Sequence, residues 1–226
     1  MIYITGDTHG EELRFLEGNM PGEQTWTQED YLIVCGDFGY VFLDDAYERM
    51  FLDLLEKKPY TICFCDGNHE NFDRLYQYPE EQWHGGKIHR VRKNIIHLMR
   101  GEIFEICGKK VFAMGGAYSI DKYMRKEGYS WWPQELPAPE EYRQAGQNLQ
   151  KHNFQVDLVI THTAPTEVIR RMGYTPDDHD RELRGFLEWV MYETQYSQWF
   201  FGHWHEERKL PEYKMRGLWF DVIAVE

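Results

Sequence analysis

The sequence predicts an α/β protein with two β-sheets, and two patterns in the chain indicate this fold class. In the first third, short apolar segments recur at intervals of about 30 residues, each followed by helix-like sequence, which matches the length of a βαβ unit. In the middle, β-like segments follow one another without helices between them, which favours antiparallel hairpins. We expect these hairpins to begin a second sheet packed on the first.

Three strands are expected in the first third of the chain, because three segments there are apolar and rich in residues that favour strands. The longer of the two helices expected between them has lysines in its last turn and Pro59 beyond it, which is typical of a helix end. The expected strands cover residues 1–5, 31–35 and 60–65, and the helices cover residues 11–16 and 45–58.

Glycines divide the next part of the chain into four β-like segments, at residues 87–91, 94–99, 102–106 and 110–114. A basic cluster lies in the first of these segments and just beyond it. We interpret the cluster as a solvated strand face and not as a track for phosphates. Its members are Lys87, His89, Arg90, Arg92 and Lys93.

Residues 118–139 form the most irregular stretch, with Tyr-Ser-Trp-Trp-Pro at its centre. Long aromatic loops in compact domains are often functional, so this stretch is a candidate substrate lid. Alternatively, Trp131 and Trp132 fill a gap in the core. A polar helix is expected directly afterwards, at residues 140–153.

The strand and helix pattern returns in the last third of the chain, and residues 218–225 alternate weakly and are expected to close the second sheet. No linker rich in Pro, Gly or Ser marks a boundary, so residues 1–226 are predicted to form a single domain. The other elements expected here are strands at residues 156–160 and 198–201 and helices at residues 167–172 and 180–196.

The composition limits the class of partner. With 42% hydrophobic and 16% aromatic residues, the chain can bury a sizeable core. A formal net charge of -13 argues against an extensive grip on nucleic-acid backbones, which depends on Lys and Arg. It does not exclude a nucleotide substrate, because bound divalent cations invert the local field.

The cysteines and the N-terminus favour a cytoplasmic protein. All four cysteines lie in apolar segments, where they are expected to be small buried hydrophobic residues in a reducing compartment. The N-terminus does not resemble a signal peptide, and no apolar segment is long enough to span a membrane. The cysteines are Cys35, Cys63, Cys65 and Cys107.

Side chains of the kind that bind metals follow five of the expected strands, where each strand ends. In an isolated Asp-X-His, the Asp more often caps a helix beside a solvated His. Here the arrangement recurs, and packing alone does not explain it, because each buried polar group would need its own partner. We therefore predict a shared metal site, whereas His97 and His152 are expected to be ordinary core residues. The strand-end residues are Asp7, His9, Asp37, Asn68, His69, His162, His203 and His205.

The ordered motifs Asp-X-His, Gly-Asp, Gly-Asn-His-Glu, His and Gly-His-X-His resemble those of the calcineurin-like metallophosphoesterase superfamily. The resemblance implies a four-layer αββα sandwich of two mixed β-sheets flanked by helices, with two metal ions at one edge. It also implies that His69 is a catalytic residue that donates a proton to the leaving oxygen. By the same resemblance, Asp7, His9 and His205 hold the first metal, Asn68, His162 and His203 hold the second, and Asp37 bridges them.

The implied chemistry is the hydrolysis of a phosphoester. Two cations roughly 3.5–4 Å apart can bind both non-bridging oxygens of a phosphate and activate a shared water as hydroxide. Mixed carboxylate, amide and imidazole ligands suit Mn²⁺, which is our first expectation, and also Fe or Zn²⁺.

The chain departs from the serine/threonine protein phosphatase branch, which it partly resembles. That branch has Asp-Arg-Gly after the bridging Asp, whereas Phe38 follows here. The missing Asp would orient the catalytic His, and the missing Arg would clamp the phosphate. We predict that Asp66 replaces the Asp, and that Arg125, or Arg170 and Arg171, replace the Arg. The segments 116–121 and 131–133 are similar to those of small uncharacterised bacterial or phage-type metallophosphoesterases.

The expected activity is therefore metal-dependent hydrolysis of a phosphomonoester or phosphodiester of a small or nucleotide-like molecule. The acidic composition and the aromatic loop fit a compact substrate better than a long polyanion. The alternatives are a serine/threonine-type protein phosphatase, a nuclease, and a binding module that holds metal without catalysis. The sequence leaves the oligomeric state open.

Overall fold

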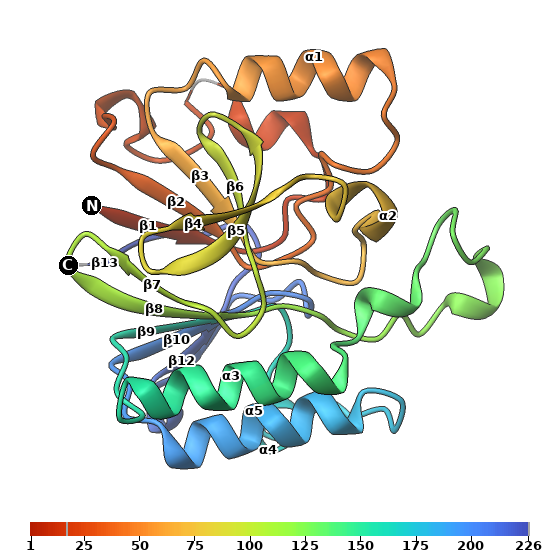
Figure 1. Cartoon of the computed structure of the whole chain (residues 1–226), viewed down its shortest axis with the longest axis vertical. Coiled ribbons are helices and arrows are strands. Elements are labelled where there is room, and N and C mark those ends of the chain that lie inside the picture. The colour runs from red at the N-terminus through yellow and green to blue at the C-terminus, as the bar shows by residue number, and fades with distance from the viewer. Residues whose placement is uncertain (17, 226) are drawn as a thin grey trace.

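The computed structural model describes residues 1–16 and 18–225. Two mixed β-sheets lie face to face, with α1 (Ala46–Leu55) outside the first sheet and α3 (Pro139–Lys151), α4 (Thr166–Met172) and α5 (Arg181–Glu193) outside the second (Figure 1). A one-turn helix, α2 (Phe72–Leu75), follows the third strand. The predicted four-layer α/β sandwich is thus confirmed.

The first sheet has seven strands in the order β13-β1-β2-β3-β6-β5-β4. Strands β1, β2, β3 and β6 run parallel, and the outer strands β13, β5 and β4 pair antiparallel. The strands are β1 (Ile2–Thr5), β2 (Tyr31–Val34), β3 (Thr61–Phe64), β4 (Glu80–Trp83), β5 (Gly86–Arg92), β6 (Ile95–Leu98) and β13 (Val222–Val225).

The second sheet has six strands in the order β11-β12-β10-β9-β8-β7. Its four central strands run parallel, and β11 and β7 are antiparallel edges. The strands are β7 (Ile103–Ile106), β8 (Lys109–Met114), β9 (Leu158–Thr161), β10 (Gln198–Phe201), β11 (Arg208–Leu210) and β12 (Met215–Gly217).

Two predicted sheet assignments were wrong. The hairpin β5–β6 extends the first sheet, because β6 pairs with the free edge of β3, with Ile95 opposite Ile62. The C-terminal strand β13 also joins the first sheet, where Ile223 lies opposite Ile4 of β1, and β12 and β11 close the second sheet instead. Strand periodicity shows which face of a strand is buried but not which free edge it pairs with.

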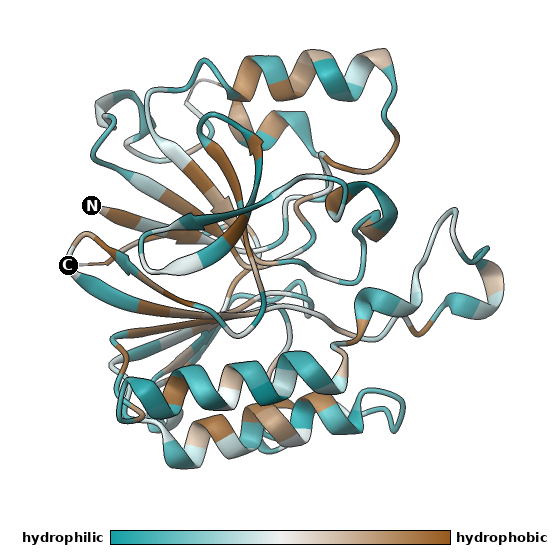
Figure 2. Ribbon diagram, in the orientation of Figure 1, coloured by the Kyte–Doolittle hydropathy of each residue, from teal (hydrophilic) through white to brown (hydrophobic). Residues whose placement is uncertain are grey.

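Alternating side chains divide the core into layers, as the period of a strand requires. In β2, Ile33 packs between the two sheets, whereas Leu32 and Val34 pack under α1. The helices on the second sheet cover a separate cluster that includes Trp199 and Phe201. Figure 2 accordingly shows hydrophobic residues concentrated on the strands and hydrophilic residues on much of the helices.

Two smaller expectations, on the first helix and on the burial of the cysteines, differ from the structure. The helix expected at residues 11–16 is a 3₁₀ turn at Glu12–Phe15. Cys107 is exposed, whereas Cys35 and Cys63 are buried with Cys65. No helix within the described residues is long and apolar enough to cross a membrane.

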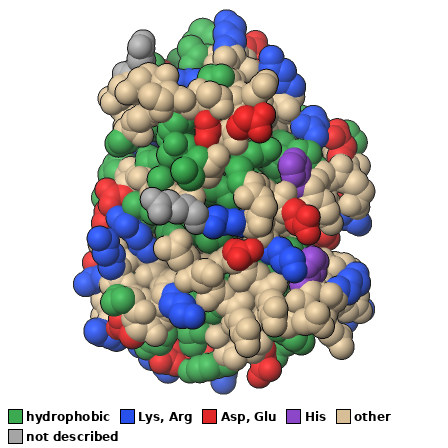
Figure 3. Space-filling model, turned by 90° about the vertical axis from the view of Figure 1, so that its left-hand side faces the viewer, with side chains coloured by type: hydrophobic (Ala, Val, Ile, Leu, Met, Phe, Trp, Pro, Cys, Tyr) green, Lys and Arg blue, Asp and Glu red, His purple; other side chains and the backbone are tan. Residues whose placement is uncertain are grey.

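Ion pairs account for most of the basic cluster on β5. Lys87 pairs with Glu80, and Arg90 pairs with Glu81 on the neighbouring strand. His89 is an exception, because it is buried. Basic and acidic side chains are also interspersed on the face of the molecule shown in Figure 3.

Candidate metal centre

The loops that follow β1, β2, β3, β9 and β10 bring the strand-end residues together. Asp7, His9 and His205 form the first group: the Asp7 Oδ2 atom lies 3.1 Å from His205 Nε2 and 3.7 Å from His9 Nε2. The two imidazole Nε2 atoms are 2.9 Å apart. Together these residues offer three ligand atoms within 4.8 Å of one another.

A second group adjoins the first through two buried carboxylates, and it consists of Asp7, Asp37 and His162. The His162 Nε2 atom lies 3.4 Å from Asp37 Oδ2 and 3.0 Å from Asn68 Oδ1. Asp37 Oδ2 is also 3.6 Å from His9 Nε2, so this carboxylate of the second group reaches a member of the first, and Asp7 belongs to both groups.

His203 completes the constellation. Its ring centroid is 5.0 Å from that of His162, and its backbone N–H donates to both carboxylate oxygens of Asp7 at 3.0 Å. The structure thus brings together all seven residues that the sequence analysis selected as metal ligands.

Four of these residues have left-handed backbone conformations, which are uncommon for residues other than glycine. The φ angles are 46° for His9, 47° for Asp37, 68° for His203 and 49° for His205. Such conformations cost energy and concentrate at functional sites. The loops therefore have a strained backbone at the positions where these side chains converge.

Two glycines permit the close packing of the donors. A Cβ atom on Gly36 would lie 2.1 Å from His162 Nδ1, and one on Gly202 would lie 1.9 Å from Asp7 Oδ1. Any side chain at these positions would displace a metal-ligand candidate. The Gly-Asp and Gly-His-X-His motifs thus need glycine for steric reasons.

The orientation of His162 suits metal binding. Its Nδ1 atom lies 2.8 Å from the carbonyl oxygen of Cys35, which fixes the tautomer with the proton on Nδ1 when the ring is neutral. Nε2 then carries the free lone pair and faces Asp37 and Asn68. A backbone carbonyl that holds the other ring nitrogen is a usual partner of metal-binding histidines.

The charges of the centre favour a cation. Burial opposes ionisation of Asp37, but the neighbouring imidazoles, His162 first, hold its pKa well below its usual range. Burial would lower the pKa of His162, but Asp37 and Asp7 raise it to about 10. Burial and His162 lower the pKa of His203 to about 3. Anionic carboxylates packed among imidazoles form a donor set that fits a divalent metal such as Mn²⁺, Fe or Zn²⁺.

Metal binding is expected to strengthen as the pH rises from 6 to 8. With a pKa of about 10, His162 is protonated in this range, and a cation can bind Nε2 only after the proton leaves. Each released proton makes the apparent dissociation constant about tenfold smaller per pH unit. Titrations with Mn²⁺ in two buffers of different ionisation enthalpy would count the protons, and a pH-independent affinity would contradict the expectation.

His69 and Arg125 lie beside the centre. The backbone N–H of His69 donates to Asp37 Oδ1 at 2.7 Å, and the guanidinium of Arg125 lies 3.0–3.1 Å from both imidazole nitrogens. Asp121 and the carbonyl oxygen of Ser130 hold Arg125 in place. Arg171, by contrast, pairs with Glu212 and is exposed. Of the arginines considered, Arg125 is the one the structure places against the candidate proton donor.

Within the described residues, Asp66 forms no hydrogen bond with His69, although the sequence analysis predicted that it would orient this histidine. Its carboxylate accepts from Arg100 Nε at 2.8 Å and lies 3.1 Å from His97 Nε2. Burial would raise the pKa of Asp66, but Arg100 and His97 hold it below its usual range. Arg100 also donates to the carbonyl oxygen of Gln134, so Asp66 ties the loop after β3 to the base of residues 118–139.

Replacing Arg100 with Met is expected to lower the free energy of unfolding by about 3–5 kcal/mol, because it leaves the Asp66 carboxylate buried without its ion pair. Urea denaturation would measure the loss. Arg90→Met is the matched control, since it removes a partly exposed pair with Glu81 and should cost less than about 1 kcal/mol. Equal losses in the two variants would contradict the structural role of Arg100.

The sequence analysis missed Ser119. The side-chain amide of Asn68 donates to Ser119 Oγ at 3.0 Å, which turns Asn68 Oδ1 towards His162. Ser119 is held in turn by its own N–H, which donates to the buried carboxylate of Glu135. The only signal in the sequence was that residues 116–121 resemble a segment of related proteins, which implied no role.

Residues 118–139 contact the metal centre and also contribute to the core. They extend from the body of the molecule on the side to which β1, β2 and β3 point (Figure 1). Trp132 is buried, its Nε1–H donates to Asp73, and its ring meets Phe42 edge-on at 5.6 Å. Trp132 therefore fills a gap in the core, whereas Arg125 of the same segment lies against His69.

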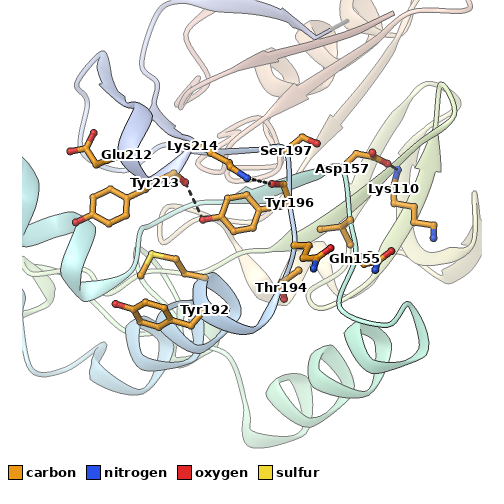
Figure 4. A pocket seen from close by; sticks show the side chains of 13 residues that line it. Lys110, Gln155, Asp157, Tyr192, Thr194, Tyr196, Ser197, Glu212, Tyr213 and Lys214 are labelled. Atoms are coloured by element: carbon orange, nitrogen blue, oxygen red, sulfur yellow. Dashed lines mark hydrogen bonds between the residues drawn. The ribbon is translucent and has the colours of Figure 1, made fainter.

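A cavity of about 880 Å³ lies elsewhere, near the start of β9 and β10. Figure 4 shows Asp157, Ser197, Tyr196 and Lys214 among the side chains that line it. Its lining residues, as far as the structure describes them, include none of the metal-ligand candidates, so its size does not make it the candidate active site.

The comparison with family models agrees with the geometry. The model described as "Calcineurin-like phosphoesterase" matches residues 1–207, a range that contains every metal-ligand candidate. A search of curated proteins found no match. The chain belongs to the calcineurin-like phosphoesterase family.

Proposed function

We propose that this protein is a dimetal phosphoesterase that hydrolyses a phosphomonoester or phosphodiester of a small or nucleotide-like molecule. The observation that carries the proposal is the convergence of seven donor side chains from five strand ends, with His69 and Arg125 beside them. Family membership supports the hydrolytic chemistry. The substrate class is our own inference from the site.

The donor set divides into two sites that share Asp37. Asp7, His9 and His205 would hold one cation, and Asn68, His162 and His203 would hold the other. When bound there, two divalent cations would polarise the phosphate and lower the pKa of a water that attacks phosphorus. The buried donors and the Nδ1–Cys35 hydrogen bond of His162 keep the ligand atoms oriented before the substrate arrives.

Arg125 is the proposed phosphate clamp, and His69 is the proposed proton donor. Burial lowers the pKa of His69 against the opposing effect of Asp37, and Arg125 lowers it further. A phosphate bound by Arg125 would offset the positive charge next to the imidazole. The pKa of His69 would then rise, which favours the protonated form that can supply the leaving oxygen.

Residues 118–139 are the proposed lid. Arg125 and Ser119 connect this segment to His69 and Asn68, so a movement of the segment would alter both the clamp and a metal ligand. The acidic composition favours a compact substrate over a long polyanion. We further propose that residues 1–226 act as one domain, because the two sheets share the core between them.

The experiment that tests the proposal compares two substrates. The protein is stripped with a chelator and restored with Mn²⁺, and hydrolysis of an aryl phosphomonoester is compared with hydrolysis of the matching phosphodiester. Mn²⁺-dependent turnover of either supports the enzyme, and the preferred substrate separates monoesterase from diesterase. Failure to hydrolyse either one with two bound metals would favour a binding module that holds metal without catalysis.

A further inference from the structure

We infer that a cavity beside the metal centre binds an aromatic, uncharged leaving group of the substrate. This inference rests on the proposed function and narrows its substrate class. The cavity has a volume of about 400 Å³, and His9 and His69 lie among its lining residues. Most of the rest of the lining is apolar or aromatic, and includes Tyr40, Phe42, Tyr47 and Phe51.

The loop that forms this cavity has a fixed shape. Glu48, at 7% exposure, accepts hydrogen bonds from the backbone N–H groups of Phe42 and Leu43, each at 2.6 Å. An ion pair with Arg74 neutralises the Glu48 carboxylate. Asn71 donates to the carbonyl oxygen of Phe42 at 2.8 Å. The loop thus presents Phe42 in a defined position before any ligand binds.

The cavity lining contains both buried aromatic side chains and exposed hydrophobic side chains. Tyr40 and Phe51 are buried and stacked, with ring centroids 4.9 Å apart and an interplanar angle of 14°. Leu43 and Tyr47 are 69% and 50% exposed, although both are large hydrophobic side chains. An aromatic ligand would cover apolar surface that is otherwise in contact with water.

The charge of the lining selects against anionic leaving groups. Apart from the two histidines, the ionisable side chains among the described lining residues are Asp45 and Glu48, and Glu48 is paired with Arg74. A leaving group with a second phosphate or a carboxylate would meet no Lys or Arg among the described residues that line the cavity. The cavity therefore fits the phosphoester of an uncharged aromatic alcohol or a nucleoside better than a polyphosphate.

The cavity lies next to the proposed proton donor and next to one metal-ligand candidate, His9. Hydrolysis forms a bond from water oxygen to phosphorus and breaks the bond from phosphorus to the leaving oxygen, which takes up a proton. His69, the proposed source of that proton, belongs to the cavity lining, and Arg125 lies against its imidazole. A phosphate held between the metal ligands and Arg125 would direct the organic group past His69 into the cavity.

Binding of two phosphonates tests this inference without turnover. Benzylphosphonate, in which a methylene replaces the ester oxygen of phenyl phosphate, is compared with methylphosphonate by calorimetry on the Mn²⁺-loaded protein. We expect benzylphosphonate to bind about tenfold more tightly, because its ring is removed from water. Adding a para-carboxylate to the ring should weaken binding.

Two substitutions locate the ring. Phe42→Ala and Tyr47→Ala are each expected to lower benzylphosphonate affinity about tenfold and to remove its advantage over methylphosphonate. Tyr192→Ala is the matched control, since Tyr192 is 67% exposed on α5 and lies outside the cavity lining. It should leave both affinities unchanged.

The outcomes separate the two proposals. If both phosphonates bind the unsubstituted protein equally tightly, the proposed leaving-group site is wrong, whereas the proposed phosphate site still holds. If both variants still bind benzylphosphonate more tightly than methylphosphonate, the ring binds elsewhere, and the proposed leaving-group site is again wrong. No binding of either phosphonate to the metal-loaded protein would overturn the proposed function itself.

Discussion

Replacing Asp37 with Asn is expected to lower kcat by about 10³-fold or more, the upper end for losing one charge-stabilising group, while the fold survives. Asp37 Oδ2 lies between His162 and His9, at 3.4 and 3.6 Å from their Nε2 atoms. A neutral amide cannot supply the negative charge that would hold two cations. Its remaining oxygen can still accept the hydrogen bond from the His69 N–H, which preserves the loop.

Metal content and turnover must be measured together on this variant. We expect fewer bound Mn²⁺ ions per chain, together with an unchanged circular dichroism spectrum. Asp53→Asn is the matched control, because Asp53 is 64% exposed on α1 and only approaches Arg92 at 3.5 Å. An Asp37→Asn protein that keeps both metals and normal turnover would show that Asp37 does not bridge the metal site.

The metal-ligand candidates could be predicted from the sequence because each of them directly follows the carboxyl end of a strand. Asp7 and Asp37 follow β1 and β2, which pair in parallel register, with Ile4 opposite Ile33. Parallel strands end at the same edge of a sheet, so residues that follow them converge whatever the rest of the fold does. The same local rule placed His162 after β9 and His203 after β10.

Pairing between distant segments could not be predicted in this way. Strand β13 occupies the free edge of β1, although 216 residues separate Thr5 from the start of β13 at Val222 in the chain, and no local pattern records that choice. Asp66 shows the same limit at the level of a side chain. It lies three residues before His69, yet Arg100, from a distant part of the chain, determines where its carboxylate points.

Residues that support the site are harder to predict than those that form it. Ser119 acts on Asn68 through one hydrogen bond across 51 positions, and a serine in an irregular segment carries no distinctive signal. Glu48 resembles an ordinary helix residue, but its carboxylate holds the loop that carries Phe42. Such roles depend on tertiary contacts, which is why the cavity beside His69 was apparent only in the structure.

Replacing His69 with Gln is expected to affect substrates according to their leaving groups. His69 is the proposed proton donor, and loss of such a group lowers rates by about 10²–10⁴-fold when the leaving oxygen needs a proton. A phosphate ester of an aliphatic alcohol should show this loss. The 4-nitrophenyl ester should lose much less, because 4-nitrophenolate can leave without a proton.

The dependence on the leaving group distinguishes proton donation from other roles of His69. If the imidazole only helped to hold metal or substrate, both esters would lose turnover by the same factor, and the proton-donor role would be wrong. Metal content measured on the same samples excludes loss of a cation as the cause. His152→Gln is the matched control, because His152 caps the end of α3 and should leave both rates unchanged. A large loss confined to the aliphatic ester would therefore assign the proton transfer to His69 itself, next to the cavity that receives the leaving group.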